Sequence, residues 1–322
     1  MYIYQSRFAE SIQGMLDFKE QLGYAKSTHE PSLRSFDRYC AELYPETVML
    51  SKELVLAWLE KRPNENSGGL KKRANTIRQF GKYLTYMENT AYVLPAGYIG
   101  GRSSFVPYIL TDEELVSFFH AADSFPASRI VPCRHYVVSV FFRLVYCCGL
   151  RPNEGRLLRV DDVDLYNGRI LVSGTKRNRD RIVMMSDDVA HLCARYDGIV
   201  RILSPKREYF FPNPTGGAYA PNTMEHIFLK CWQMSTTSKT YARRPCIYSL
   251  RHRFATAIIM NWMESGQDVQ SILPHLSAYM GHASLSATAY YIHLLPSNLT
   301  LSKTVDWNRF SALIPEVRYE GC

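Results

Sequence analysis

Apolar residues recur at helical spacing in four stretches within the first ninety residues of the chain. This spacing places them along one face of a helix, which would then pack against its neighbours. We therefore predict four short helices that form a small bundle. The stretches run from Phe8 to Leu22, from Leu33 to Leu43, from Leu54 to Leu59 and, after the polar break PNENSGG, from Leu70 to Met87.

The periodicity stops after residue 92, where proline, glycine and serine crowd together between Pro95 and Pro107. Because such residues interrupt helices and strands, we expect a linker over residues 93–107. It would separate an N-terminal domain, residues 1–92, from a larger domain, residues 108–322. The larger domain opens on TDEE (111–114), which fits a helix capping box, and a largely apolar helix is expected to run from there to Leu150.

Two later segments, residues 168–173 and 181–185, are rich in apolar and β-branched residues and flank the basic loop GTKRNRD. This pattern predicts a strand pair with a basic tip. Helical spacing then returns towards the C-terminus. The expected fold class is mainly α with a small β-sheet, with a helical N-terminal domain and a mixed α+β second domain.

Charge and composition indicate which partners and which cellular compartment to expect. The chain has 322 residues, and its 38 Lys and Arg exceed its 30 Asp and Glu, a net charge of +8 that favours a polyanionic partner without requiring one. The eight cysteines include no CxxC pair, so no metal site is predicted. No secretory signal is visible, and the longest apolar stretch, Tyr136 to Leu150, is too short to cross a membrane. We expect a cytoplasmic protein with reduced thiols.

Four segments carry residues suited to phosphate chemistry: CGLRPNEGRLL (148–158), SGTKRNRDR (173–181), YSLRHRFAT (248–256) and YMGHASLSATAYYIH (279–293). Taken singly, each has an ordinary explanation, such as a surface ion pair, a core ion pair, a solvated loop or aromatic packing. Together they supply two arginines, a lysine, a histidine and a tyrosine. A phosphodiester attacked by tyrosine needs such a set, because fixed cations stabilise the added charge on its oxygens.

The surroundings of two of these cations suggest their roles. Lys176 has Arg177, Arg179 and Arg181 as neighbours, and these like charges are expected to lower the pKa of Lys176, which makes it a better acid towards a leaving oxygen. Arg251 is expected in the first turn of a helix, where a guanidinium beside free N–H groups can hold a phosphate.

The conjunction of segments resembles the motif boxes of the tyrosine recombinases of the phage integrase type. CGLRPNEGRLL is similar to the family's first arginine box, with Arg151 and the supporting acidic residue Glu154. TKRNRDRIVMM resembles the hairpin that carries the family's catalytic lysine, here Lys176.

The remaining two boxes complete the resemblance. YSLRHRFAT matches the second arginine box with Arg251, although Tyr248 stands where many members have histidine. MGHASLSATAYYIH matches the last box and gives His282 and, nine residues later, Tyr291. The longer run from Leu273 also resembles recombinases encoded by transposons and other bacterial mobile elements.

The resemblance implies a SAM-like core-binding domain and a catalytic domain that close as a C-shaped clamp on double-stranded DNA. Tyr291 would form a 3′-phosphotyrosine, Lys176 would protonate the freed 5′-oxygen, and Arg151, Arg251 and His282 would hold the phosphate. Glu154 and Tyr248 complete the expected catalytic set, and no cofactor, metal or ATP is implied.

Further expectations concern DNA contacts and assembly. Four copies would assemble on two DNA sites, with or without partner recombinases. The C-terminal segment, with Trp307, Phe310, Leu313 and Ile314 at helical spacing, would dock on a neighbouring copy or pack on its own domain. The residues expected to contact DNA are Lys71, Arg78, Lys82, Arg177, Arg179, Arg181, Arg243 and Arg244. For the first three, a solvated basic helix face is the alternative.

Two other functions are alternatives to site-specific recombination. A type IB topoisomerase shares the tyrosine chemistry but relaxes supercoils as a monomer, and the spacing of the boxes favours the recombinase. A DNA-binding accessory protein would have lost catalysis, and the intact set of arginines, lysine, histidine and tyrosine speaks against it.

Overall fold

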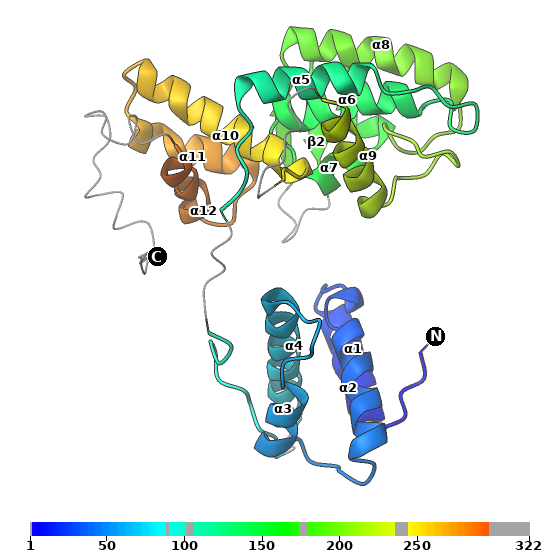
Figure 1. Cartoon of the computed structure of the whole chain (residues 1–322), viewed down its shortest axis with the longest axis vertical. Helices are drawn as coiled ribbons and strands as arrows, with labels where there is room; N and C mark the ends of the chain where they lie inside the picture. The colour runs from blue at the N-terminus through cyan, green and yellow to red at the C-terminus, as the bar shows by residue number, and fades with distance from the viewer. Residues whose placement is uncertain (1, 88–89, 101–105, 174–179, 236–243, 296–322) are drawn as a thin grey trace. The chain divides into compact units, whose positions relative to one another are not determined.

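The computed structural model describes residues 2–87, 90–100, 106–173, 180–235 and 244–295, except for the side chain of His293. Its contacts divide the chain into two compact units, Met1–Ser104 and Phe105–Cys322. Figure 1 shows the helices of each unit. None of the helices described is both long enough and apolar enough to cross a membrane.

The N-terminal unit is built from the four predicted helices. The prediction is confirmed, because each apolar stretch lies on or at the end of a helix and supplies the core of the unit. Aromatic rings fill that core, and the rings of Phe36 and Trp58 meet edge to face with centroids 5.3 Å apart. The helices are α1 (Ala9–Gln21), α2 (Glu30–Leu43), α3 (Lys52–Trp58) and α4 (Ser67–Tyr86), with the short 3₁₀ helix η1 (Lys26–Thr28) after α1.

The start of α4 differs from the expected polar break, since the helix already includes both glycines of that segment. Asn66 is its N-cap, and the Asn66 side chain accepts a hydrogen bond from the Gly69 N–H at 2.8 Å. A side-chain cap of this kind stabilises the first turn by about 1 kcal/mol, which offsets the weak helix propensity of one glycine.

The predicted linker is also shorter than expected at its N-terminal end. Leu94 is 1% exposed within the core of the N-terminal unit, and its carbonyl oxygen accepts a hydrogen bond from Nε of Arg78 at 3.0 Å. Just before it, the Tyr92 N–H donates to the Leu50 carbonyl at 2.7 Å. Gly81 permits this approach, because a Cβ there would lie 2.5 Å from the Tyr92 carbonyl oxygen. The apolar side chain of Leu94 therefore ties this part of the segment to the unit.

The larger unit begins with the capping box predicted at Thr111, whose side chain accepts from the Glu114 N–H at 3.2 Å. The single helix predicted from there to Leu150 is wrong: two helices are present, and Pro126 and Pro132 lie between them. Proline lacks the N–H that a helix interior needs. The two helices are α5 (Asp112–Asp123) and α6 (Arg134–Cys147).

The predicted strand pair is confirmed as part of a three-stranded antiparallel sheet in the order β1-β2-β3. Val172 pairs with Arg181 and Ile170 with Val183, so that Ile170, Val172 and Val183 face the core. The elements from α7 to the sheet are α7 (Pro152–Arg156), η2 (Val160–Asp162), β1 (Val163–Asp164), β2 (Arg169–Val172) and β3 (Arg181–Met184).

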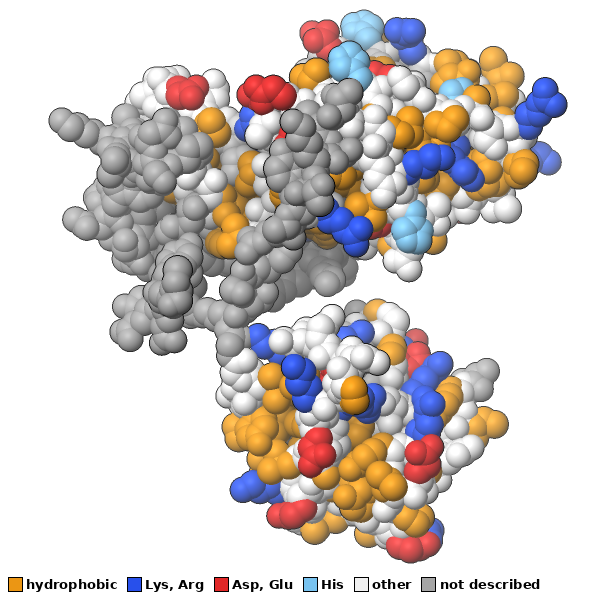
Figure 2. Space-filling model, in the orientation of Figure 1, with side chains coloured by type: hydrophobic (Ala, Val, Ile, Leu, Met, Phe, Trp, Pro, Cys, Tyr) orange, Lys and Arg blue, Asp and Glu red, His pale blue; other side chains and the backbone are white. Residues whose placement is uncertain are grey.

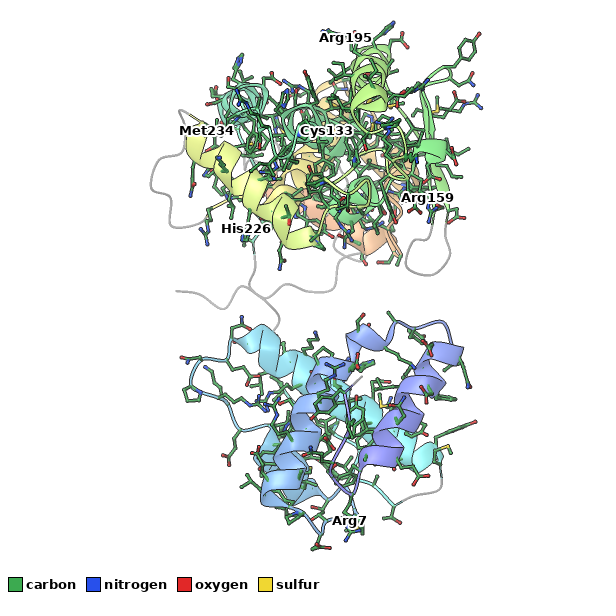
Figure 3. All side chains as sticks on the ribbon, turned by 90° about the vertical axis from the view of Figure 1, so that its right-hand side faces the viewer. Arg7, Cys133, Arg159, Arg195, His226 and Met234 are labelled. Carbon is green, nitrogen blue, oxygen red and sulfur yellow. The ribbon has the colours of Figure 1, made fainter. Side chains whose placement is uncertain are left out.

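Two hydrophobic cores meet in the larger unit. One lies among α5, α6, α8, α9 and the sheet, and the other among α10, α11, α12 and η3. Figure 3 shows Cys133 within the first and Arg195 on the outer side of α8. Helix α10 joins the cores, with Leu250 in the first and Ala255 in the second. The remaining elements are α8 (Asp187–Leu203), α9 (Pro221–Met234), α10 (Ile247–Glu264), α11 (Val269–Met280), α12 (Leu285–Ala289) and η3 (Tyr290–Leu294).

Candidate active site

Three arginines converge on the C-terminal end of α11. The carbonyl oxygens of residues 279, 280 and 281 accept hydrogen bonds from Arg181, Arg251 and Arg151, at 2.7, 2.7 and 2.5 Å respectively. The last carbonyls of a helix have no partner within it and form the negative end of its dipole, so they attract cations. The end of α11 thus gathers guanidinium groups from β3, from α10 and from the residue before α7.

Arg251 is the most deeply buried of the three, at 2% exposure. It also donates to the Gly149 carbonyl at 2.5 Å. Because α10 begins at Ile247, Arg251 lies in the second turn and not in the predicted first turn, so the helix N-terminus does not supply N–H groups beside it. Burial, followed by the neighbouring Arg151, lowers the pKa of Arg251 to about 10, and Arg251 remains a cation at neutral pH.

Glu154 binds the other two arginines. Its carboxylate accepts a hydrogen bond from the Arg151 side chain at 2.6 Å and two from Arg181 at 3.0 and 2.7 Å. Burial raises the pKa of Glu154, but the hydrogen bonds from Arg181 and from the Arg151 N–H outweigh it, so the pKa lies below its ordinary value. Glu154 is therefore an ionised support that holds Arg151 in place.

The surroundings of Arg181 contradict the expectation that its side chain contacts DNA. Arg181 is the first residue of β3, at the base of the loop, and its side chain is 10% exposed. Its guanidinium is committed to Glu154 and to the Tyr279 carbonyl. The long side chain reaches back to the end of α11 because a buried carboxylate and an unpaired helix carbonyl lie there together.

Gly281 allows the arginines to approach this closely. Its φ of +66° ends α11 in the left-handed region, where glycine is the usual helix cap. A Cβ at this position would lie 2.8 Å from Nη1 of Arg181 and 3.3 Å from Nη1 of Arg151. Glycine suits this backbone conformation, and a side chain at this position would have to displace the guanidinium group of Arg181.

His282 follows Gly281 and is held at both ring nitrogens. Nε2 lies 3.0 Å from Nη2 of Arg251, and Nδ1 lies 2.7 Å from Oγ1 of Thr288. Since arginine only donates, Nε2 accepts and Nδ1 carries the proton. Burial, followed by Arg251, Arg151 and Arg181, lowers the pKa of His282 to about 3, so the imidazole is neutral at physiological pH.

Tyr291 lies in η3 against this cluster and is 4% exposed. Its ring stacks on that of His282, with centroids 6.0 Å apart and planes inclined by 22°. Burial raises the pKa of Tyr291, while Arg251 and Arg151 oppose that rise. The site therefore places a buried, protonated phenol beside fixed cations.

His252 is a site residue that the sequence reasoning missed. Its Nδ1 lies 3.1 Å from the hydroxyl oxygen of Tyr291. Burial, followed by Arg251, lowers the pKa of His252 to about 4. The histidine directly follows Arg251 in YSLRHRFAT, but nothing in the periodicity of α10 shows which side chain of that helix Tyr291 contacts.

Tyr248, at the position where the recombinase box has histidine, lies one turn before His252 on α10. It is 43% exposed, and its ring centroid is 6.2 Å from that of His252. Tyr248 therefore lies at the edge of the candidate site. The structure thus brings together five predicted residues (Arg151, Glu154, Arg251, His282 and Tyr291) and leaves Tyr248 at their margin.

The remaining predicted residues lie outside the described residues, on α4 or just before α10. Lys176, Arg177, Arg179 and Arg243 fall outside the described residues, as do Trp307, Phe310, Leu313 and Ile314. Arg244 is exposed just before α10, and on α4 Lys82 is exposed while Lys71 and Arg78 are partly buried. In Figure 2, the Lys and Arg side chains on the visible face of the N-terminal unit lie among acidic and hydrophobic ones.

Comparisons with known proteins agree with this arrangement. The chain matches the phage integrase family over residues 109–298. It is 30% identical over 292 residues to the integrase/recombinase y4rE of Sinorhizobium fredii, an alignment that covers 88% of this chain and 90% of that protein.

Solved structures show the same fold. The XerH site-specific recombinase bound to a palindromic difH substrate superposes with a TM-score of 0.65 at 20% identity, covering 96% of this chain and 92% of that one. A lambda integrase tetramer bound to a Holliday junction gives 0.62 at 13% identity, covering 88% and 76%. The mainly helical fold with a small sheet is thereby confirmed. A family match over more than half of the chain, containing the arginine cluster and its buried tyrosine, shows that this protein belongs to the phage integrase family of tyrosine recombinases.

Proposed function

We propose that this protein is a site-specific DNA recombinase that cuts and rejoins DNA through a 3′-phosphotyrosine at Tyr291. The position of that side chain carries the proposal, since the phenol is buried against His282 and within the field of Arg151 and Arg251. An oxygen nucleophile among fixed cations suits attack on a phosphodiester, whose charge grows as the new bond forms.

In the proposed reaction, Oη of Tyr291 attacks the scissile phosphorus and the bond to the 5′-oxygen breaks. Lys176 protonates that oxygen, while Arg151 and Arg251 stabilise the non-bridging oxygens and His282 holds Arg251 in place through its Nε2. A 5′-hydroxyl from a second strand reverses the step. Because the phosphotyrosine conserves the bond energy, the scheme uses no ATP, cofactor or metal.

Double-stranded DNA is the proposed substrate for both units, with the N-terminal unit as the core-binding domain. Lys71, Arg78 and Lys82 on α4 would contact the DNA backbone, as would four arginines of the catalytic unit, Arg177, Arg179, Arg243 and Arg244. Contacts to phosphate position a protein on the duplex and make its affinity depend on salt. Arg181 is not among them, because Glu154 and α11 occupy it.

Four copies would form the synaptic complex, with or without partner recombinases. Lambda integrase, whose fold is similar, is a tetramer in its complex with a Holliday junction. The segment with Trp307 and Phe310 would dock on the neighbouring copy. We further propose that the protein is encoded by a mobile element, takes part in its integration, excision or transposition, and works in the bacterial cytoplasm.

Neither alternative function is favoured. The similarity to an integrase/recombinase over 88% of the chain supports recombination over supercoil relaxation, and the assembled cluster supports catalysis over a silent accessory role. Relaxation of a plasmid that lacks the recombination site would revive the first alternative. Tight DNA binding without any covalent product would revive the second.

Covalent capture tests the proposal. The purified chain is mixed, without divalent metal, with nicked duplexes from a genomic library and then denatured. Wild type and Tyr290→Phe should each form a denaturant-resistant adduct, and Tyr291→Phe should form none. Sequencing the trapped DNA then defines the site. An adduct that persists in Tyr291→Phe would refute the assignment of the nucleophile.

A further inference from the structure

A tyrosine that attacks phosphorus must lose its phenolic proton, and the proposed function does not say which group receives it. The hydroxyl of Tyr291 lies 3.1 Å from Nδ1 of His252, within hydrogen-bond distance. The two rings are neighbours as well, with centroids 5.6 Å apart. Within the described part of the chain, this contact places a nitrogen that can accept a proton next to the proposed nucleophile.

The other groups around the hydroxyl are unsuited to this role. Arginine has no acceptor atom, so Arg251 can only donate. His282 offers no free lone pair, since its Nε2 accepts from Arg251 and its Nδ1 bears the proton directed at Thr288. Tyr248 occupies the position of a histidine in the family's box, but it offers a hydroxyl in place of an imidazole nitrogen, and it is 43% exposed.

His252 is in the correct protonation state to act as a base. Its half-buried imidazole is neutral at physiological pH, since the loss of solvent and, after it, Arg251 lower the pKa of His252 to about 4. A phosphodiester bound at Arg251 would bring negative charge next to that arginine and offset part of its effect. The basicity of His252 would then rise when the substrate is in place.

We propose that His252 is the catalytic base that takes the proton of Tyr291 during cleavage and returns it during ligation. This inference rests on the proposed function. In cleavage, the bond from Oη of Tyr291 to phosphorus forms and the bond from phosphorus to the 5′-oxygen breaks. The phenolic proton moves to Nδ1 of His252, and the proton on the leaving oxygen comes from Lys176. Ligation reverses both transfers, so the reaction consumes no proton.

Two substitutions separate a base from a group that only positions the tyrosine. His252→Ala removes the contact, whereas His252→Asn keeps a hydrogen-bond acceptor near the place of Nδ1 but cannot take a proton. We expect both variants to form the covalent adduct about a hundredfold more slowly than wild type, the size of effect typical of general base catalysis. His191→Asn, which alters an exposed histidine on α8, is the matched control and should react like wild type.

A fluorinated tyrosine at position 291 supplies a chemical readout. Because its phenol is more acidic, it needs a base less, and it should restore most of the lost rate in His252→Asn. The same replacement should not rescue Lys176→Ala, which lacks the acid at the other end of the reaction. A near-normal rate in His252→Asn, or no rescue by the fluorinated residue, would overturn the assignment and leave His252 a positioning residue.

A measurement without DNA tests the contact between Tyr291 and His252 separately from the proposed function. Nitrogen-detected NMR of the full chain, with histidines assigned by substitution, should show His252 protonated at Nε2 and its Nδ1 signal changed in Tyr291→Phe. Protonation at Nδ1 would contradict the role of base, even if wild type proved inactive on DNA. If wild type formed no adduct on any duplex but His252 had the expected tautomer, the proposed function would be at fault and the tyrosine–histidine contact would stand.

Discussion

Arg181 and Glu154 form a two-point ion pair, with Nη1 and Nη2 of the arginine 3.0 and 2.7 Å from the two carboxylate oxygens. Each side chain is only 10% exposed. The pair links the base of the β2–β3 hairpin to the helix that follows Arg151. A residue expected to touch DNA is instead part of the frame that positions Arg151, the arginine that we propose binds phosphate.

Glu154→Gln should therefore impair both folding and catalysis. Removing one partner of a buried ion pair costs about 3–5 kcal/mol, because the remaining charge stays buried without compensation. Here two guanidinium groups would lose their carboxylate. We expect a lower urea midpoint and a lower yield of covalent adduct. Unchanged values of both would mean that water or the α11 carbonyls suffice to hold the arginines.

Gly281→Ala should stop catalysis by displacing two arginines. A Cβ there would lie 2.8 Å from Arg181 and 3.3 Å from Arg151, in addition to a backbone cost of about 1–2 kcal/mol for a left-handed conformation. Gly266→Ala is the matched control, since Gly266 has a φ of +71° but no atom within 4 Å of its Cβ position. Adduct formation should be lost only in Gly281→Ala, while both variants lose stability. Equal activity in the two variants would contradict the steric account.

The two half-buried histidines of the candidate site predict a loss of stability in mild acid. The pKa values of His252 and His282 are lowered to about 4 and about 3 in the folded chain, whereas an unfolded histidine titrates near 6.5. Below about pH 6.5 the unfolded state therefore binds more protons, and stability falls as the pH drops towards the folded values, by at most about 1.4 kcal/mol per pH unit for each histidine.

Urea unfolding of the catalytic unit within the full chain, followed between about pH 7 and pH 5, measures this loss. The slope should be smaller in His252→Asn, which removes one of the two groups. A variant with the slope of wild type would show that His252 is not held neutral by the fold.

Two basic residues of α4, Arg78 and Lys82, should differ in their contributions to DNA affinity and to stability. Lys82 is exposed, so Lys82→Ala is expected to weaken DNA binding and reduce the slope of log affinity against log salt by about 1, with thermal stability unchanged. Arg78 donates from Nε to the Leu94 carbonyl, so Arg78→Ala should also lower the melting temperature. Fluorescence anisotropy in a salt series and thermal unfolding give the two readouts. A flat salt dependence in wild type would argue against binding through phosphate contacts.

Much of this protein was determined by local sequence alone. Helical spacing located the four N-terminal helices, and alternation located β2 and β3. The segments around Arg151, Arg251, His282 and Tyr291 also predicted residues that meet in the candidate site, because these short motifs join a chemical group to the turn or helix that presents it. The break between α5 and α6 was open to sequence reasoning too, since Pro126 and Pro132 mark it.

Tertiary structure decided which of these groups meet. The end of α11 and Arg151 are 130 residues apart in the chain, and the contact between His252 and Tyr291 spans 39 residues. Periodicity shows which face of a helix or strand is apolar, but not which other element packs on that face. The contact of His252 with Tyr291 and the contacts of Arg181 with Glu154 and α11 could therefore not be predicted. Both follow from packing, in which unpaired carbonyls at a helix end and a buried carboxylate draw the nearest long cations inward.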